Sequence, residues 1–299
     1  MSSIPQITVC VCTFKRSAWL SSLLGHLEAQ RTDGLFTHDV VVADNDAARS
    51  AEGVVVHYAT TSTMRITYCV EPEQNISLVR NRAVANARGQ LLAFIDDDEL
   101  PVTDWLFELY QTGLKYQVDG VLGPVLPRFQ NAAPRWLIKG RFFDRPRHPT
   151  GSPVDWPEAR TGNVLLSRHV LDSVSPPFRP QFGSGGEDVD FFRRASESGF
   201  KFVWCDAAVV HEVVPPYRCT LRFLIRRAVL RGSNFPKQSA PRTKNVVKSV
   251  VAVPSYAVAL PFLAVVAHPL FFAYLIKLFE HGSRLLALAG LPLLTERDT

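Results

Sequence analysis

The feature that most constrains the fold is a short apolar run that ends in four acids. Residues 91–95 (Leu-Leu-Ala-Phe-Ile) are followed directly by Asp96, Asp97, Asp98 and Glu99. Such a run is typical of a buried β-strand, and four adjacent negative charges repel one another unless a cation compensates them. Mg²⁺ and Mn²⁺ prefer carboxylate oxygens, and ligands of open parallel sheets bind beyond the carboxyl ends of the strands. The pattern predicts a metal-binding strand end, with a solvated acidic turn as the alternative.

Strand-like runs alternate with helical patterns over the first 125 residues. The apolar runs cover residues 7–13, 39–44, 65–70, 91–96 and 120–125. Between the first two, four leucines have the i, i+3, i+4, i+7 spacing of an amphipathic helix: Leu20, Leu23, Leu24 and Leu27. A second helix is expected to begin with Ser77 as its cap and to run to about Arg88, before Gly89. This alternation predicts an α/β fold with a mostly parallel sheet and helices on both faces.

The pattern becomes irregular after the fifth run. Residues 124–157 are crowded with proline, arginine and aromatic residues and show little periodicity. We interpret them as a long irregular loop that faces the substrate. Helical periodicity returns at residues 187–198, and a strand-like run follows at 200–205.

Charge divides the chain into unlike parts. Residues 1–212 carry 21 Lys or Arg and 25 Asp or Glu, and no acid lies between Glu212 and Glu280, where there are ten Lys or Arg. A basic segment beside an apolar one favours an anionic membrane surface over nucleic acid. We expect a folded domain at 1–215, a basic linker or helix at 216–248 and an apolar membrane-associating tail at 249–299.

The tail can meet a membrane in several ways. Residues 249–276 contain no Asp, Glu, Lys or Arg, and a stretch of that length can cross a bilayer. It is interrupted by Pro254, Pro261, His268 and Pro269. A single span, a re-entrant hairpin, an interfacial helix pair with 278–294 and a buried helical layer all remain open.

A second acidic group follows a glycine-rich turn. Gly183, Gly185 and Gly186 precede Glu187 and Asp188 at the start of a predicted helix. The helix dipole favours ionised acids there, so the pair is either an ordinary helix start or includes a general base for an attacking hydroxyl. The three glycines indicate a close approach of the backbone to a ligand.

Histidine and cysteine give weaker signals. His211 ends an apolar run and is either a structural residue or a metal ligand or phosphate contact. The five cysteines are odd in number, lie mostly in apolar runs and form no CxxC pair. They predict buried thiols in a reducing cytoplasm rather than disulfides.

Five motifs in this order resemble glycosyltransferase family 2. They are residues 9–13 with a helix after them, 42–45, 75–82, 94–98 and 186–188. The resemblance covers about residues 6–212 and implies the A-type glycosyltransferase fold, which is Rossmann-like. Stretches at 123–127, 160–165 and 185–192 most resemble bacterial exopolysaccharide glucosyltransferases of the succinoglycan-assembly type.

The resemblance also implies site residues. Thr13 and Asp44 would line the nucleotide base pocket, and Arg80 would approach the nucleotide or support the acidic strand end. The full set implied to bind the nucleotide-sugar is Thr13, Asp44, Arg80, Asp96 and Asp97. The implied ligands of Mg²⁺ or Mn²⁺ are Asp98, Asp96 and His211. Asp188 matches the catalytic base, and Glu187 would orient the substrate. The first motif lacks the family's usual proline at 13–16, which leaves the contacts of that loop open.

The implied activity is an inverting transfer of a hexose, expected to be glucose, from a UDP-sugar to a lipid-linked saccharide in bacterial exopolysaccharide synthesis. The expected location is the cytoplasmic face of the inner membrane, with no nucleic acid as partner. One alternative is a phosphatase with Asp96 as nucleophile and Asp98 as acid. Another is a membrane scaffold that binds a nucleotide-sugar without turnover.

Overall fold

The computed structural model describes residues 4–235, 243–266 and 269–294. The chain forms two compact units, the first made of Met1–Leu126 and Arg145–Val213, the second of Pro127–Asp144 and Val214–Thr299. The expected domain at 1–215 is therefore interrupted, because residues 127–144 belong with the C-terminal unit.

The first unit contains a seven-stranded sheet in the order β3-β2-β1-β4-β8-β6-β9. Its strands are β1 (Gln6–Thr13), β2 (Thr37–Asp44), β3 (Ile66–Val70), β4 (Leu91–Asp96), β6 (Gly120–Leu122), β8 (Asn163–Ser167) and β9 (Phe202–Trp204). All neighbouring pairs are parallel except those of β8, which runs antiparallel to β4 and β6. The predicted mostly parallel sheet is confirmed. The central strand β8 was not predicted, because its short apolar run follows the irregular segment without a periodic signal.

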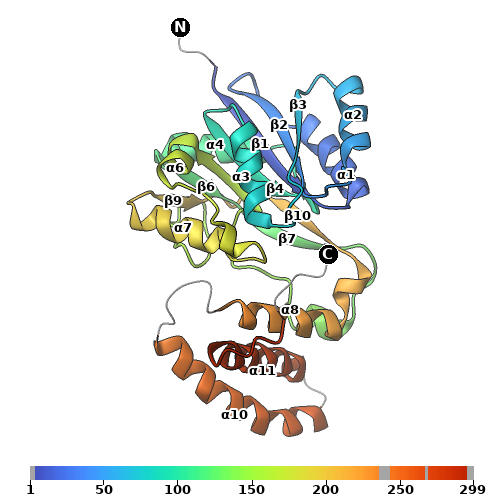
Figure 1. The fold of residues 1–299 in the computed structure, drawn as a ribbon, viewed down its shortest axis with the longest axis vertical. Helices are drawn as coiled ribbons and strands as arrows, with labels where there is room; N and C mark the ends of the chain where they lie inside the picture. The colour runs from blue at the N-terminus through green and yellow to red at the C-terminus, as the bar shows by residue number, and fades with distance from the viewer. Residues whose placement is uncertain (1–3, 236–242, 267–268, 295–299) are drawn as a thin grey trace. The chain divides into compact units, whose positions relative to one another are not determined.

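Helices cover both faces of this sheet (Figure 1). They are α1 (Ser17–Glu28), α2 (Glu52–Thr61), α3 (Ile76–Asn86), α4 (Trp105–Tyr116), α6 (Arg168–Ser173) and α7 (Glu187–Glu197). Alternate residues of a strand point to opposite faces, so Val9 and Val11 of β1 share a core with α1, α2 and α4, while Cys10 shares a second core with α3, α6 and α7. The four leucines predicted to form the apolar stripe of α1 are all buried.

The start of α3 differs from its prediction. Asn75 is the cap: its backbone is extended and its side-chain oxygen accepts hydrogen bonds from the N–H groups of Ser77 and Leu78 at 3.0 and 3.2 Å. Ser77 is buried inside the helix, so its prediction as the cap was wrong. The amide side chain two residues earlier satisfies the free N–H groups of the first turn.

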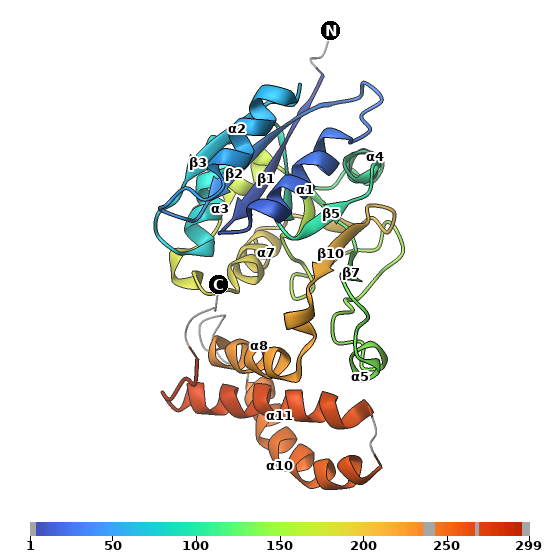
Figure 2. The same cartoon turned by 90° about the vertical axis from the view of Figure 1, so that its right-hand side faces the viewer.

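The segment predicted to be one irregular loop contains two regular elements, β7 (Val125–Phe129) and α5 (Arg135–Lys139). A three-stranded sheet has the order β5-β10-β7, with β5 at Glu99–Pro101 and β10 at Val210–Val214 (Figure 2). The prediction was wrong for these elements because Pro127 and Pro134 were read as signs of irregular structure. They lie in an edge strand and at the start of a helix, where proline is tolerated.

The second unit is helical. Its main helices are α8 (Leu221–Ser233), α10 (Thr243–Val265) and α11 (Pro269–Leu288), and α11 lies between the other two (Figures 1 and 2). Helix α10 continues through Pro254 and Pro261, so the interruptions expected there are not observed, and His268 lies outside the described residues. Within the described ranges, one helix, over Asn245–Val265, is long and apolar enough to cross a membrane. Only 6% of its most apolar window is buried, which contradicts a buried helical layer.

Candidate active site

The acid run turns sharply at the end of β4. Asp96 is the last residue of β4 and its side chain is 45% exposed, whereas Asp97, Asp98 and Glu99 are buried. A solvated acidic turn would expose all four, so the arrangement excludes that alternative. Burying several carboxylates together is costly unless cations or hydrogen-bond donors compensate them.

Thr13 at the end of β1 and Arg16 just after it supply part of that compensation. The Thr13 hydroxyl donates to one Asp97 oxygen at 2.8 Å, and the Arg16 guanidinium lies 2.9 Å from the other and 3.7 Å from Asp98. Burial raises the pKa of Asp97 to about 6, against the lowering effect of Arg16. The structure therefore joins Thr13 and Asp97, two of the predicted nucleotide-sugar contacts.

Arg80 connects the acid run with the second acidic group. From α3, its guanidinium forms one ion pair with Glu187 and another with Asp96 at 3.2 Å. Arg80 and Glu187 are both buried. Burial lowers the pKa of Arg80, but Glu187 and Asp96 outweigh this effect, so the net shift is upward. The bridge ties the end of β4 to the start of α7.

This bridge predicts a large stability effect. Arg80→Met leaves the Glu187 carboxylate buried without its cation, so we expect the free energy of unfolding to fall by about 3–5 kcal/mol. Arg82→Met, on the same helix, is the matched control: Arg82 is 48% exposed and pairs with Glu71 at 3.3 Å, and we expect a change below about 1 kcal/mol. Urea denaturation measures both, and equal stabilities would contradict the buried bridge.

The backbone conformation and the space around it explain why this turn is rich in glycine. Gly185 and Gly186 have φ angles of +124° and +94°, which side chains rarely adopt, and Gly186 caps α7. A Cβ on Gly183 would lie 2.5 Å from the Asn75 side chain. The close approach predicted for Gly183 therefore involves the start of α3, whose Ile76 N–H donates to the Gly183 carbonyl at 3.2 Å.

Asp188 and Asp190 have different surroundings. Asp188 is partly exposed, at 17%, and its carboxylate lies 3.9 Å from the Arg160 guanidinium. Asp190 is buried and forms ion pairs with three arginines, at 3.0 Å with Arg193, 2.8 Å with Arg194 and 3.6 Å with Arg179. Asp188 is thus partly exposed to solvent, whereas Asp190 is enclosed by arginines.

Asp44 is enclosed by its own loop. Its carboxylate is fully buried and accepts hydrogen bonds from the N–H groups of Asp46 and Ala51 and from the Tyr68 hydroxyl, at 2.8 to 3.0 Å. Asp44 therefore fixes the conformation of the loop between β2 and α2. The predicted base pocket would include this loop.

The predicted metal ligands are not assembled as a closed set. His211 lies on β10 opposite Leu100 of β5, just beyond the acid turn. Among the described residues, no three His, Cys, Asp or Glu side chains are grouped for metal binding. Asp96 and Asp98 still fit a hard cation, because Mg²⁺ is usually held by one or two carboxylates together with substrate phosphates. The exposed Asp96 oxygens meet that requirement.

Comparison with known proteins decides the family. A model of the family "Glycosyl transferase family 2" matches residues 8–172, more than half of the chain. The chain belongs to glycosyltransferase family 2. Membership removes the phosphatase alternative.

Curated relatives of this family 2 glycosyltransferase include one from an exopolysaccharide pathway. The chain is 36% identical over 240 residues to the succinoglycan biosynthesis protein ExoM of Rhizobium meliloti (strain 1021), covering 79% of this chain and 76% of the relative. It is 25% identical over 214 residues to glycosyltransferase AglE of Haloferax volcanii, covering 71% and 67%.

Solved structures show the fold. Staphylococcus aureus TarS 1-349 in complex with UDP superposes with a TM-score of 0.54 at 15% identity, covering 95% of this chain and 92% of that one. The complex with UDP-GlcNAc gives 0.53 at 16% identity, covering 75% and 66%. This glycosyltransferase has the A-type fold.

Three site residues of this glycosyltransferase were not predicted: Arg16, Glu99 and Arg160. Glu99 accepts a hydrogen bond from the Asp96 N–H at 3.0 Å, and burial, then Asp96, raises the pKa of its carboxyl. A Cβ on Gly162 would lie 2.7 Å from Glu99, so that glycine leaves room for it. Two sequence features could have identified two of these residues. Glu99 belongs to the acid run, and Arg16 lies where the first motif departs from the usual pattern of the family.

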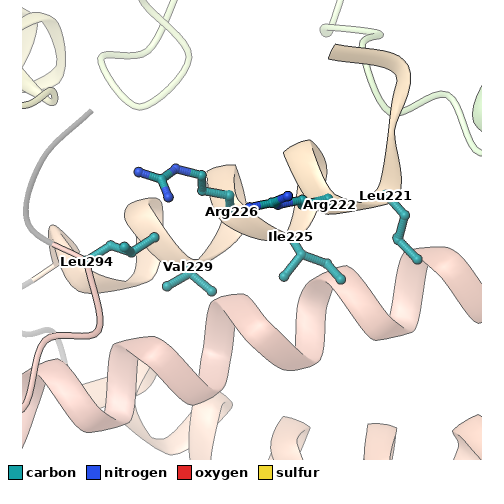
Figure 3. A pocket seen from close by; sticks show the side chains of 6 residues that line it. All are labelled: Leu221, Arg222, Ile225, Arg226, Val229 and Leu294. Carbon is teal, nitrogen blue, oxygen red and sulfur yellow. The ribbon is translucent and has the colours of Figure 1, made fainter. Parts of the chain in front are cut away.

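A hollow of about 530 Å³ lies on α8 of the second unit (Figure 3). It is lined by Leu221, Arg222, Ile225, Arg226, Val229 and Leu294. None of the predicted site residues of the glycosyltransferase lines it.

Proposed function

We propose that this glycosyltransferase moves a hexose, glucose as the first candidate, from a UDP-sugar to a lipid-linked saccharide in exopolysaccharide synthesis, with inversion. The observation that carries the chemistry is the Arg80 bridge, which holds the exposed Asp96 and the start of α7 together. The 36% identity to a succinoglycan biosynthesis protein supports the pathway. The UDP and UDP-GlcNAc complexes of TarS support a uridine donor.

The acid run would bind the donor diphosphate. Asp96 and Asp98, with His211 as a proposed third ligand, would hold Mg²⁺ or Mn²⁺, which acts as a Lewis acid on the leaving diphosphate. Arg80 fixes the Asp96 carboxylate, and Arg16 lies 3.7 Å from Asp98. The acid run therefore has an arginine on each side of it.

Asp188 would serve as the general base. It lies in the first turn of α7, and its carboxylate is 3.9 Å from the Arg160 guanidinium. Its partly exposed carboxylate can accept the proton of the acceptor hydroxyl. Glu187 is held by Arg80 and would orient substrate. One base and one leaving group give a single displacement, which inverts the anomeric carbon.

The nucleotide would be received by the ends of β1 and β2. Thr13 and Asp97 are already joined by a hydrogen bond of 2.8 Å, and Asp44 shapes the next loop through its backbone contacts. We propose that these three position the base and ribose, with Asp44 acting through the loop that encloses it.

The second unit supports the proposed acceptor and location. Its apolar helix α10 and basic α8 would place the enzyme on the cytoplasmic face of the inner membrane, where a lipid-linked saccharide can reach it. Nucleic acid is not proposed as a partner.

A donor screen tests the proposal. Purified full-length protein is offered UDP-glucose, UDP-galactose and UDP-GlcNAc with Mg²⁺ or Mn²⁺ and with membranes as acceptor, and UDP release is measured. We expect the fastest release from UDP-glucose, only when acceptor membranes are present. Release from none of the donors would favour the scaffold that binds without turnover.

A further inference from the structure

Helix α10 has an inner and an outer face. On the inner face, Ser249 lies 2.9 Å from His281 of α11, and the Tyr256 and Tyr274 rings are 4.9 Å apart. On the opposite face, six apolar residues share one side of the helix and are each more than half exposed. We call them the outer stripe: Val247, Val250, Val251, Val258, Phe262 and Val265. An exposed apolar stripe of this length marks an interaction surface.

The inner contacts show how α10 is held. Ser249 contacts His281, and seven residues later on α10 Tyr256 contacts Tyr274, which is seven residues earlier on α11. The two helices therefore lie side by side and antiparallel. Helix α11 is joined in turn to α8: Arg231 pairs with Glu280 at 3.3 Å, and a Cβ on Gly232 would collide with Ser283. The three helices form one layer with α11 in the middle (Figure 2).

The charges of this layer oppose insertion along the bilayer normal. Arg226 points away from α11, while Ile225 and Val229 point towards it (Figure 3), and Arg222 and Arg226 are both exposed. If α10 crossed the bilayer with the layer intact, these arginines would enter the apolar interior, where a charged side chain is costly. If the layer lies flat on its α10 side, they stay in water.

The same layer complements an anionic surface. Lys248 of α10 and Lys277 of α11 are exposed, and both charges act on His281 between the two helices. In the described parts of α8, α10 and α11, the one carboxylate is Glu280, which is engaged by Arg231 and Arg284. Lysines beside an apolar face are typical of helices that lie in the membrane interface.

We infer that α10 lies in the plane of an anionic membrane, with the outer stripe at the acyl boundary and Lys248 and Lys277 at the headgroups. This inference rests on the proposed function only in taking the membrane as the partner. It selects an interfacial position of α10 over a span or a re-entrant hairpin.

Depth measurements test the orientation. Val251→Cys, Val258→Cys and Val265→Cys stand seven residues apart on one face and are nitroxide-labelled one at a time in the full chain, bound to vesicles of phosphatidylcholine with phosphatidylglycerol. The parent chain, labelled in the same way, gives the background nitroxide signal of the five native cysteines. We expect equal depths at the three positions, whereas a span places Val258 deepest. Val56→Cys on α2, exposed in the first unit, serves as the water-accessible reference.

A charge variant gives an independent readout. Val258→Glu should weaken vesicle binding by roughly tenfold or more, because it places a charge at the acyl boundary of the membrane, and Val56→Glu should leave binding unchanged. Unequal depths, no binding to the anionic vesicles, or spin–spin contact between copies without lipid would overturn the inference. The vesicle assay needs no sugar donor, so its failure is distinguishable from failure of the proposed transfer.

Discussion

Asp188→Asn is expected to lower the rate of sugar transfer by roughly 10²–10⁴-fold while donor binding persists. The amide keeps the size of the carboxylate but cannot accept the proton of the acceptor hydroxyl. The carboxylate is partly exposed in the first turn of α7, so its removal should cost little stability. UDP-release kinetics and calorimetric donor binding, measured on the same preparation, separate the two effects.

Two variants of the same helix control this prediction. Glu197→Gln removes a charge that is 61% exposed, and transfer should be unchanged. Asp190→Asn should cost far less transfer than Asp188→Asn, but it breaks up a buried group of three arginines, so we expect lower stability. Equal losses of transfer per folded molecule at Asp188 and Asp190, or an α-linked product by NMR from an α-linked donor, would refute the role of Asp188.

Asp98→Ala is expected to reduce transfer by roughly 10³-fold or more, because a metal that neutralises a leaving diphosphate supplies several kcal/mol of transition-state stabilisation. The fold should survive, since Thr13 and Arg16 continue to hold Asp97 when the Asp98 carboxylate is removed. Transfer by the parent enzyme should fall in excess chelator and return with Mg²⁺ or Mn²⁺.

A matched variant and a binding measurement accompany it. Asp172→Ala on α6 removes an exposed acid far along the chain from the acid run and should leave transfer unchanged. Mn²⁺ binding in the presence of UDP, followed by electron paramagnetic resonance, should weaken for Asp98→Ala alone. Undiminished transfer by the parent enzyme in excess chelator would contradict metal dependence.

The local patterns of the sequence were sufficient for much of the first unit. The β4 run was predicted with the bounds that the structure shows, and the leucine stripe of α1 is buried as its spacing required. Both follow from periodicity, which records which side of an element meets the core. The family and its fold were also recognisable from the order of five short motifs.

The errors arose where the deciding partner is distant along the chain. Strand β8 is fixed by antiparallel pairing with β4 and β6, some 70 and 45 residues earlier, and its own short run contains no such information. Gly183 was expected to approach a ligand, but it packs against Asn75, which also replaced Ser77 as the cap of α3.

By itself, the sequence determined the alternation of strands and helices, the acid run at the end of β4 and the basic, apolar character of the last third of the chain. These are properties of neighbouring residues. Only the tertiary structure decided that Arg80 joins Asp96 to Glu187, that Asp190 is enclosed by arginines while Asp188 is accessible, and that α10 exposes an apolar stripe. Ion pairs and side-chain exposure depend on which elements meet in space. The loops between these elements bring together residues that are distant in the sequence, and no local sequence pattern contains that information.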